Sequence, residues 1–317
     1  MKYRKLGNTG CRVSEISLGS WLTYAGYVEQ QTAAKIIHTA YEAGINFFDT
    51  ANVYMKGEAE KVVGEALRSF PRSSYVLATK VYFPMGDRPN ESGLSRKHVM
   101  EQAHASLERL GVDYIDLYYC HRFDEDTPVR ETLQALDDLI RQGKILYAGV
   151  SEWSATQIEQ ALELADQFLL DRIVVNQPRY NMFNRYIENE VLPVSEKYGI
   201  GQVTFSPLAN GVLTGKYKTG EAPPEGSRAK DPKSQQFINR YLTEENLLKV
   251  KKLKEIARAE DLSMVQLALA WVLRHKNVSS ALTGASKPEQ IVESAKASGV
   301  ELSDESLEAI EEILSGS

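Results

Sequence analysis

Residues 115–150 read IDLYYCHRFDEDTPVRETLQALDDLIRQGKILYAGV, and this stretch contains the pattern that decides the fold. Two short apolar runs, 115–119 and 146–150, flank a segment at 129–141 with the character of an amphipathic helix. Pro128 is suited to the first turn of that helix. A strand, a helix and a second strand in this order predict two parallel strands joined by a crossover helix.

The same alternation runs through most of the chain. The expected strands are short and apolar and lack a clean period of two, which is typical of strands buried on both faces. They lie at 16–18, 46–49, 76–79, 115–119, 146–150, 173–176, 203–205 and 280–282. Eight strand–helix units in one chain favour a closed (β/α)8 TIM barrel over an open doubly wound sheet.

Further elements complete the expected architecture. Residues 3–13 are expected to form a β-hairpin ahead of the barrel, because Gly7-Asn-Thr-Gly10 supplies turn residues. Thr32, Ser95 and Ser154 are candidate helix caps. The expected helices, the last of them extra C-terminal helices, lie at 33–42, 58–68, 96–109, 129–141, 155–165, 188–198, 244–259, 264–274, 289–297 and 304–314.

Composition limits the class of protein. The 317 residues carry a formal net charge of −6, with 43% hydrophobic and 25% charged residues, as in ordinary globular proteins. A mildly acidic chain is a poor partner for nucleic acid, and two cysteines cannot build a disulfide framework. No apolar stretch is long enough to span a membrane, and residues 1–10, MKYRKLGNTG, have no apolar core of the length expected in a signal peptide. We expect a cytoplasmic protein whose residues 1–317 form one domain, because no Pro-, Gly- and Ser-rich linker divides them.

Four polar residues follow neighbouring strands where active sites of such barrels lie. Asp49 ends the second expected strand and Tyr54 follows it, while Lys80 and His121 follow the third and fourth. Taken singly, each has an ordinary explanation, such as a turn residue, a solvated charge or a packed ring. Their common location indicates an active site.

These side chains suit proton transfer to a carbonyl oxygen. A free tyrosine loses its proton near pH 10, and an adjacent ammonium should lower that pKa. A carboxylate would hold the ammonium of Lys80, and the imidazole of His121 could orient a carbonyl group. No side chain donates hydride, so a nicotinamide or flavin is required.

Other cofactor and metal motifs are missing from the sequence. There is no G-x-G-x-x-G fingerprint of a Rossmann domain. Residues 211–217 are similar to a P-loop, but Tyr217 stands where a magnesium ligand is needed. His98 and His104 are six residues apart and no histidine pair has the spacing of a zinc protease, so we expect no metal site.

The segment 44–54, GINFFDTANVY, resembles the best-known motif of the aldo-keto reductases. Segments 93–98, 105–110, 149–153 and 206–217 are most similar to the branch that contains the voltage-gated potassium-channel beta subunits and their bacterial relatives. The resemblance implies a (β/α)8 barrel that reduces aldehydes or ketones with NADPH. It implies that Tyr54 is the general acid, that Asp49 and Lys80 tune it, and that His121 orients the substrate.

The resemblance also implies a cofactor site. Glu152 stands where Asn is usual beside the nicotinamide, and Phe205 replaces the usual Tyr or Trp that stacks on it. Arg228 and Lys287 are candidates for binding a 2′-phosphate, which favours NADP over NAD. The implied cofactor residues are Ser20, Trp21, Asp49, Ser151, Gln177, Phe205, Ser206, Pro207, Leu208, Asn210, Lys216, Arg228, Gly284, Ser286, Gln290, Glu293 and Ser294.

Several questions stay open at the level of sequence. Trp21, Tyr24, Tyr82, Phe83 and Trp153 are candidate walls of a pocket for apolar or aromatic carbonyl compounds. The long polar segment 217–242 is expected to close over the cofactor. The branch resemblance implies a tetramer and raises an alternative, an NADPH-binding regulatory subunit of a channel with weak reductase activity. A barrel isomerase or lyase is a third possibility.

Overall fold

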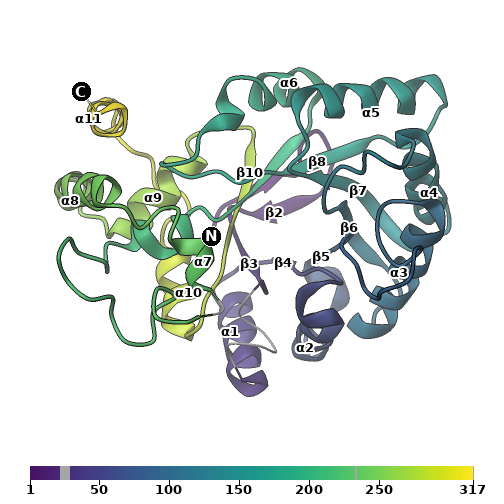
Figure 1. Cartoon of the computed structure of the whole chain (residues 1–317), viewed down its shortest axis with the longest axis horizontal. Helices are drawn as coiled ribbons and strands as arrows, with labels where there is room; N and C mark the ends of the chain where they lie inside the picture. Colours follow the sequence, from purple (N-terminus) through teal and green to yellow (C-terminus); the bar gives the residue numbers. More distant parts are fainter. Residues whose placement is uncertain (22–28, 233, 317) are drawn as a thin grey trace.

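Eight parallel strands close into a barrel in the computed structural model, which describes residues 1–21, 29–232 and 234–316 (Figure 1). All eight strands expected from the sequence are present, and consecutive strands pair around the ring until β10 returns to β3. The strands are β3 (Ile16–Gly19), β4 (Phe47–Asp49), β5 (Val76–Val81), β6 (Ile115–Cys120), β7 (Ile145–Ser151), β8 (Ile173–Gln177), β9 (Gly201–Phe205) and β10 (Val278–Thr283). The predicted (β/α)8 architecture is confirmed.

Helices surround the barrel and shield its outer face (Figure 1). They are α1 (Gln30–Glu42), α2 (Glu58–Leu67), α3 (Arg96–Leu110), α4 (Val129–Arg141), α5 (Ala155–Gln167), α6 (Val191–Tyr198), α7 (Gln235–Ile238), α8 (Glu244–Ala259), α9 (Met264–Leu273), α10 (Pro288–Ala295) and α11 (Asp304–Ser315). No helix among the described residues is both long and apolar enough to cross a membrane.

The helix starts follow local side-chain chemistry in two of three predicted cases. Ser95 and Ser154 cap α3 and α5 by accepting hydrogen bonds from backbone N–H groups in the first turn. The Thr32 prediction is wrong, because α1 already begins at Gln30 and Glu29 precedes it without a side-chain cap. Helix α4 has the bounds that the sequence predicts.

A hairpin closes the N-terminal end of the barrel. Strands β1 (Tyr3–Lys5) and β2 (Arg12–Ser14) pair antiparallel, as expected. Gly7 lies in their turn at φ +56°, and a Cβ there would come within 2.5 Å of the Gly199 carbonyl oxygen. Leu6 and Val13 are buried with apolar side chains from the barrel strands, so the functional site must lie at the opposite end.

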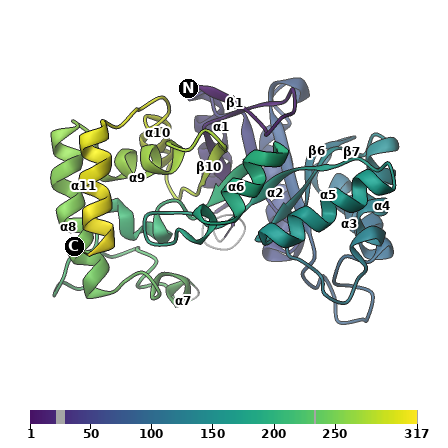
Figure 2. The same ribbon diagram turned by 90° about the horizontal axis from the view of Figure 1, so that it is seen from above.

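The C-terminal part of the chain adds helices beyond the eight units. Helices α8 and α11 lie side by side at the edge of the molecule (Figure 2). The segment 217–242 precedes α8 and contains α7, the one short helix described within it. Its residue Phe237 contacts Trp21 edge to face at 4.9 Å between ring centroids, so the segment reaches the C-terminal end of the barrel.

Candidate active site

Asp49 and Lys80 form a buried ion pair at the C-terminal end of the barrel. Strands β4 and β5, which carry these residues, end there. The side chains of Asp49 and Lys80 are 1% and 0% exposed. Lys80 Nζ contacts Asp49 Oδ1 and donates a hydrogen bond of 2.7 Å to the Thr50 carbonyl. The second carboxylate oxygen of Asp49 accepts a 2.8 Å bond from Gln177. Burial lowers the pKa of Lys80 and raises that of Asp49, and their mutual attraction opposes both shifts.

Tyr54 lies over this pair on a strained turn. The following residues Met55, Lys56 and Gly57 have φ of 49°, 53° and 93°, a left-handed run that non-glycine residues rarely adopt. Lys80 Nζ lies 5.2 Å from the centroid of the Tyr54 ring. The His121 ring lies 5.8 Å from the Tyr54 ring, so the four predicted catalytic side chains meet in one place.

The protonation of Tyr54 differs from the simplest expectation. Burial and then the charge of Asp49 hold the pKa of Tyr54 well above its ordinary value, and Arg122 only partly opposes them. The nearby ammonium of Lys80 therefore does not bring the pKa of this phenol below its ordinary value. Tyr54 therefore keeps its proton at neutral pH, the state that a general acid needs.

His121 is a neutral imidazole in this surrounding. Burial holds its pKa well below the ordinary value, and the cations Lys80 and Arg122 add to the effect. Its Nδ1 is buried without a hydrogen-bond partner among the described residues. Such an unsatisfied polar atom is typical of a site that binds a ligand.

The amide and hydroxyl expected beside the nicotinamide lie next to Asp49. Ser151 and Gln177 end the neighbouring strands β7 and β8 and are register partners. Ser151 Oγ donates to the Gln177 carbonyl at 2.9 Å. Ser20, also buried, donates to the hydroxyl of Thr50, the residue after Asp49, at 2.9 Å.

The Glu152 side chain is engaged with Arg179 and Tyr186. Its φ is +58°, and its Oε1 accepts hydrogen bonds from the Arg179 backbone at 2.6 Å and the Tyr186 hydroxyl at 2.9 Å. Arg179 also covers the Phe205 ring, with Cζ 5.3 Å from the centroid. Arg179 and Tyr186 could not be predicted from the sequence, because no strand-end pattern marks them.

A second polar region fits a phosphate-bearing cofactor. Burial lowers the pKa of Lys216, and the nearby charge of Arg228 lowers it further. Two cations held close together favour an anion between them. Asn210 belongs to the same region. Its Oδ1 lies 3.5 Å from Arg228 Nη1, and its side-chain amide donates a hydrogen bond of 2.8 Å to the Phe237 carbonyl. The predicted residues Ser206, Pro207 and Leu208 lead directly into it.

The remaining predicted cofactor contacts lie on helix α10 and on the residues just before it. Gly284, the first of them, is exposed. Ser286 and Gln290 are hydrogen-bonded through the Gln290 side-chain oxygen at 2.8 Å and 3.2 Å. Glu293 accepts bonds from the start of α9, at 2.9 Å from Gln266, and Ser294 donates to the Gln290 carbonyl within the helix. Their polar groups are thus already engaged in local structure.

The residues present fit a dinucleotide with a phosphate-rich end. The cations Lys216 and Arg228, the helix start after Ser286 and the polar strand ends by Asp49 are the series of donors that would hold it. Among the described residues no group of three or more His, Cys, Asp and Glu side chains could hold a metal ion.

The predicted substrate aromatics divide into two groups. Phe83 contacts the His121 ring at 4.9 Å and the Tyr82 ring at 5.2 Å, both edge to face. Trp153 is only 2% exposed and packs edge to face on Phe123, so its ring belongs to the packed interior. Trp21 contacts segment 217–242 as described above, and Tyr24 lies outside the described residues.

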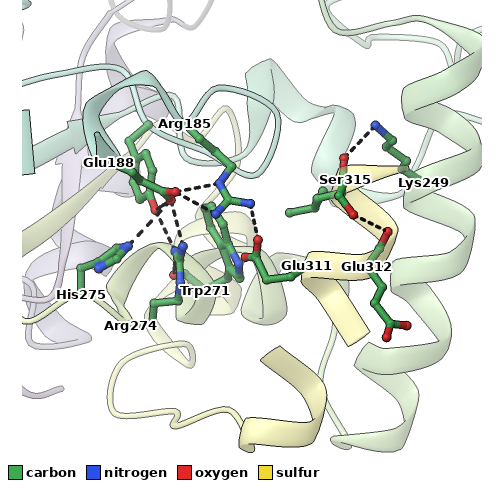
Figure 3. A network of polar contacts seen from close by, with 11 residues as sticks. Arg185, Glu188, Lys249, Trp271, Arg274, His275, Glu311, Glu312 and Ser315 are labelled. Carbon is green, nitrogen blue, oxygen red and sulfur yellow. Dashed lines mark hydrogen bonds and ion pairs between the residues drawn. The ribbon is translucent and has the colours of Figure 1, made fainter. Parts of the chain in front are cut away.

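The loop after β8 is fixed on its far side by a polar network (Figure 3). Glu188 accepts hydrogen bonds from Arg185 at 2.7 Å and from Arg274 at 2.9 Å, and Arg185 also pairs with Glu311 of α11. Tyr186 of the same loop contacts Glu152. One loop thus connects the C-terminal helix with the rim of the site.

Two surface hollows lie away from the four catalytic candidates. One, of about 550 Å³, is lined by residues of α4, α5, β7 and β8, among them Leu146, Leu169 and Arg172. The other, of about 440 Å³, lies between Arg274 and α11. Neither contains a residue of the site described above.

Comparison with known proteins yields a consistent set of relatives. A model of the aldo/keto reductase family matches residues 15–315. Proteins named as probable voltage-gated potassium channel subunit beta, from Oryza sativa subsp. japonica and Arabidopsis thaliana, are each 45% identical over 300 residues, 94% of this chain and 91% of theirs. A putative voltage-gated potassium channel subunit beta from Schizosaccharomyces pombe is 43% identical over 323 residues, 98% of this chain and 93% of its own.

Proposed function

Because this chain belongs to the aldo/keto reductase family, we propose that it reduces aldehydes or ketones to alcohols with NADPH. The observation that carries the proposal is the meeting of Tyr54, Lys80 and His121 at one point of the barrel rim. We also propose, from composition and from the branch resemblance, a cytoplasmic protein that forms a homo-oligomer, with a tetramer as the implied state.

Each side chain has a distinct part in this reaction. Tyr54 holds the proton that passes to the carbonyl oxygen, and its raised pKa keeps that proton in place until negative charge develops. Neutral His121 can donate a hydrogen bond to the same oxygen and so orient the carbonyl group. Lys80 and Asp49 hold the floor of the site in one geometry.

The cofactor would be held along the series of donors described above. When bound, the nicotinamide supplies the hydride for the carbonyl carbon. Ser151 and Gln177, joined by a hydrogen bond, would bind its carboxamide, and Phe205 would offer a ring face for stacking. Arg228 and Lys287 are the cations that would bind a 2′-phosphate, which supports NADP over NAD.

The experiment is to replace one phenolic oxygen and measure reduction. Tyr54→Phe should lower kcat for a small aromatic aldehyde by ~100-fold or more, since the general acid is removed. NADPH binding, followed by fluorescence titration, should be unchanged. The control Tyr41→Phe removes a hydroxyl that bonds Ser74 on the far side of α1, and it should leave the rate at the parent value. Equal rates for Tyr54→Phe and the parent would rule out the role given to Tyr54.

A second function is supported by the names of the relatives. We propose as the alternative that the chain binds NADPH as the regulatory subunit of a potassium channel and reduces carbonyl compounds only weakly. Against it, His121 stands where the resemblance leads us to expect Asn in channel subunits. Co-purification with a membrane channel together with slow turnover of every aldehyde tested would favour the alternative, and rapid turnover would exclude it.

A further inference from the structure

Arg122 places a positive charge at the rim of the site. It directly follows His121, and its guanidinium donates to the His121 carbonyl. Arg122 Cζ lies 5.5 Å from the Phe83 ring centroid, and that ring lies 4.9 Å from the ring of His121. The guanidinium is therefore one aromatic ring away from the imidazole that faces Tyr54.

No carboxylate among the described residues forms an ion pair with Arg122. The nearest acid in the sequence, Asp124, is engaged otherwise. Its oxygens accept from the Leu94 backbone at 2.7 Å, the Thr127 hydroxyl at 2.8 Å and the Asp126 backbone at 3.1 Å. A half-buried guanidinium without a counterion, beside a site for small molecules, is suited to an anionic ligand.

The neighbouring charges leave the rim positive. Arg179 approaches Glu152 to 3.9 Å, and the same carboxylate accepts bonds from the Arg179 backbone and from Tyr186. Glu152 therefore pairs with Arg179, and Arg122 has no ion pair within the described part of the chain. Both arginines lie close enough to influence Tyr186, which places the three side chains on the same side of the rim.

We propose that Arg122 binds a carboxylate of the substrate, so that the preferred substrates are aldehydes or ketones with a carboxylate beyond a flat or short apolar spacer. This inference deepens the proposed function and rests on it. The planar fork of a guanidinium matches the two oxygens of a carboxylate, whereas an ammonium acts as a point charge. The Phe83 ring, between Arg122 and His121, would face the spacer that joins the carboxylate to the carbonyl group.

The test compares two substrates that differ in charge. We expect the wild-type protein to prefer 4-carboxybenzaldehyde over its neutral methyl ester, methyl 4-formylbenzoate, in kcat/KM. Arg122→Gln should lower kcat/KM for the acid by about 10- to 100-fold, the usual worth of a hydrogen-bonded charge pair, and should affect the ester much less. Arg122→Lys should recover part of the preference. The control Arg12→Gln removes one exposed positive charge at the opposite end of the barrel and should leave kcat/KM unchanged for both substrates.

Binding provides a readout that does not depend on turnover. Calorimetric titration with benzoate and its neutral isostere benzamide, in the presence of NADP, should show tighter binding of benzoate in the wild type and loss of that difference in Arg122→Gln. The preference should weaken as ionic strength rises.

The outcomes separate the two levels of the proposal. Suppose that Arg122→Gln lowers kcat/KM equally for both substrates and that benzoate binds no better than benzamide. Arg122 then acts only on the pKa values of Tyr54 and His121, and the carboxylate assignment is wrong. In that case the ester is still reduced, so the reductase function stands. If neither aldehyde is reduced by the wild type, the reductase function fails, and the benzoate titration alone decides the role of Arg122.

Discussion

The contact between Lys80 and Asp49 joins two side chains with almost no access to water. Transferring two charges into an apolar interior is costly, and their attraction offsets that cost only when further hydrogen bonds satisfy both groups. Here the Thr50 carbonyl serves Lys80 and the Gln177 amide serves Asp49. Removing either partner leaves the other buried and uncompensated.

We therefore expect strong coupling between these two positions. Asp49→Asn and Lys80→Met should each destabilise the fold by about 3 kcal/mol or more. The double variant should lose clearly less free energy of unfolding than the sum of the two single losses, because no unpaired charge is left behind. Urea unfolding followed by circular dichroism at pH 7 gives the three values. The exposed pair Lys61–Glu58 is the control and should show almost no coupling. Additive losses at the buried pair would contradict this account.

Single residues differ in how far the sequence could predict them. Asp49, Lys80 and His121 could be located because barrel strands end at one rim, so position along the chain fixes position in space. The pairing of Glu152 with Arg179 could not be predicted, because it depends on the positive φ of Glu152 and on the path of the following loop. The pKa of Tyr54 also required the structure, since burial and the charge of Asp49 raise it and Arg122 opposes them only in part.

The element that carries Tyr54 is a strained turn followed by helix α2. Gly57 is its last left-handed residue, and a Cβ there would come within 2.6 Å of Arg109 Cδ. Arg109 in turn pairs with buried Glu60 in the first turn of α2. The turn and the helix are thus held by one arginine, and Tyr54 takes its position from both.

Gly57→Ala should therefore lower the stability of the fold by more than backbone strain alone would. Gly143 is a matched control, because its φ is +66° and a Cβ there meets nothing within 4 Å. Gly143→Ala should lose about 1–2 kcal/mol of stability, the cost of a left-handed non-glycine residue. Gly57→Ala should lose more and should also lower kcat, since moving Arg109 displaces Tyr54. Thermal unfolding and steady-state rates check both variants. Equal losses of stability with an unchanged kcat would show that the turn does not position Tyr54.

Element boundaries show where local chemistry decides and where it does not. Ser95 and Ser154 cap helices because each directly precedes the first turn and its side chain accepts a hydrogen bond from a backbone N–H group of that turn. Thr32 has the same capping chemistry, yet it lies inside α1, which starts two residues earlier. A residue with capping chemistry therefore marks a helix start only when the residues before it are not themselves helical.

At the scale of the whole molecule, Glu188 connects parts that are distant in sequence (Figure 3). It joins the loop after β8 to Arg274 and His275 behind α9, and through Arg185 to α11. Burial alone would raise the pKa of Glu188, but His275, whose Nε2 lies 3.8 Å away, and hydrogen bonds from Arg185 and Tyr180 hold it well below its ordinary value. Strand alternation predicts the barrel, whereas this network depends on tertiary packing that no local pattern encodes.

The depressed pKa makes the contribution of Glu188 depend on pH. The unfolded chain takes up a proton at Glu188 near pH 4.3 while the folded chain does not, so its stabilisation is present above that pH and is lost as the pH falls. Glu188→Gln should therefore cost about 1–3 kcal/mol at pH 7. The gap to the wild type should narrow steadily below about pH 4.3. Urea unfolding across this range tests it, with Glu255→Gln, whose side chain is 67% exposed, as a control without effect. A gap that stays constant down to the lowest pH would show that hydrogen bonding to the neutral amide replaces the ion pairs, and that charge at Glu188 does not hold α11 to the barrel.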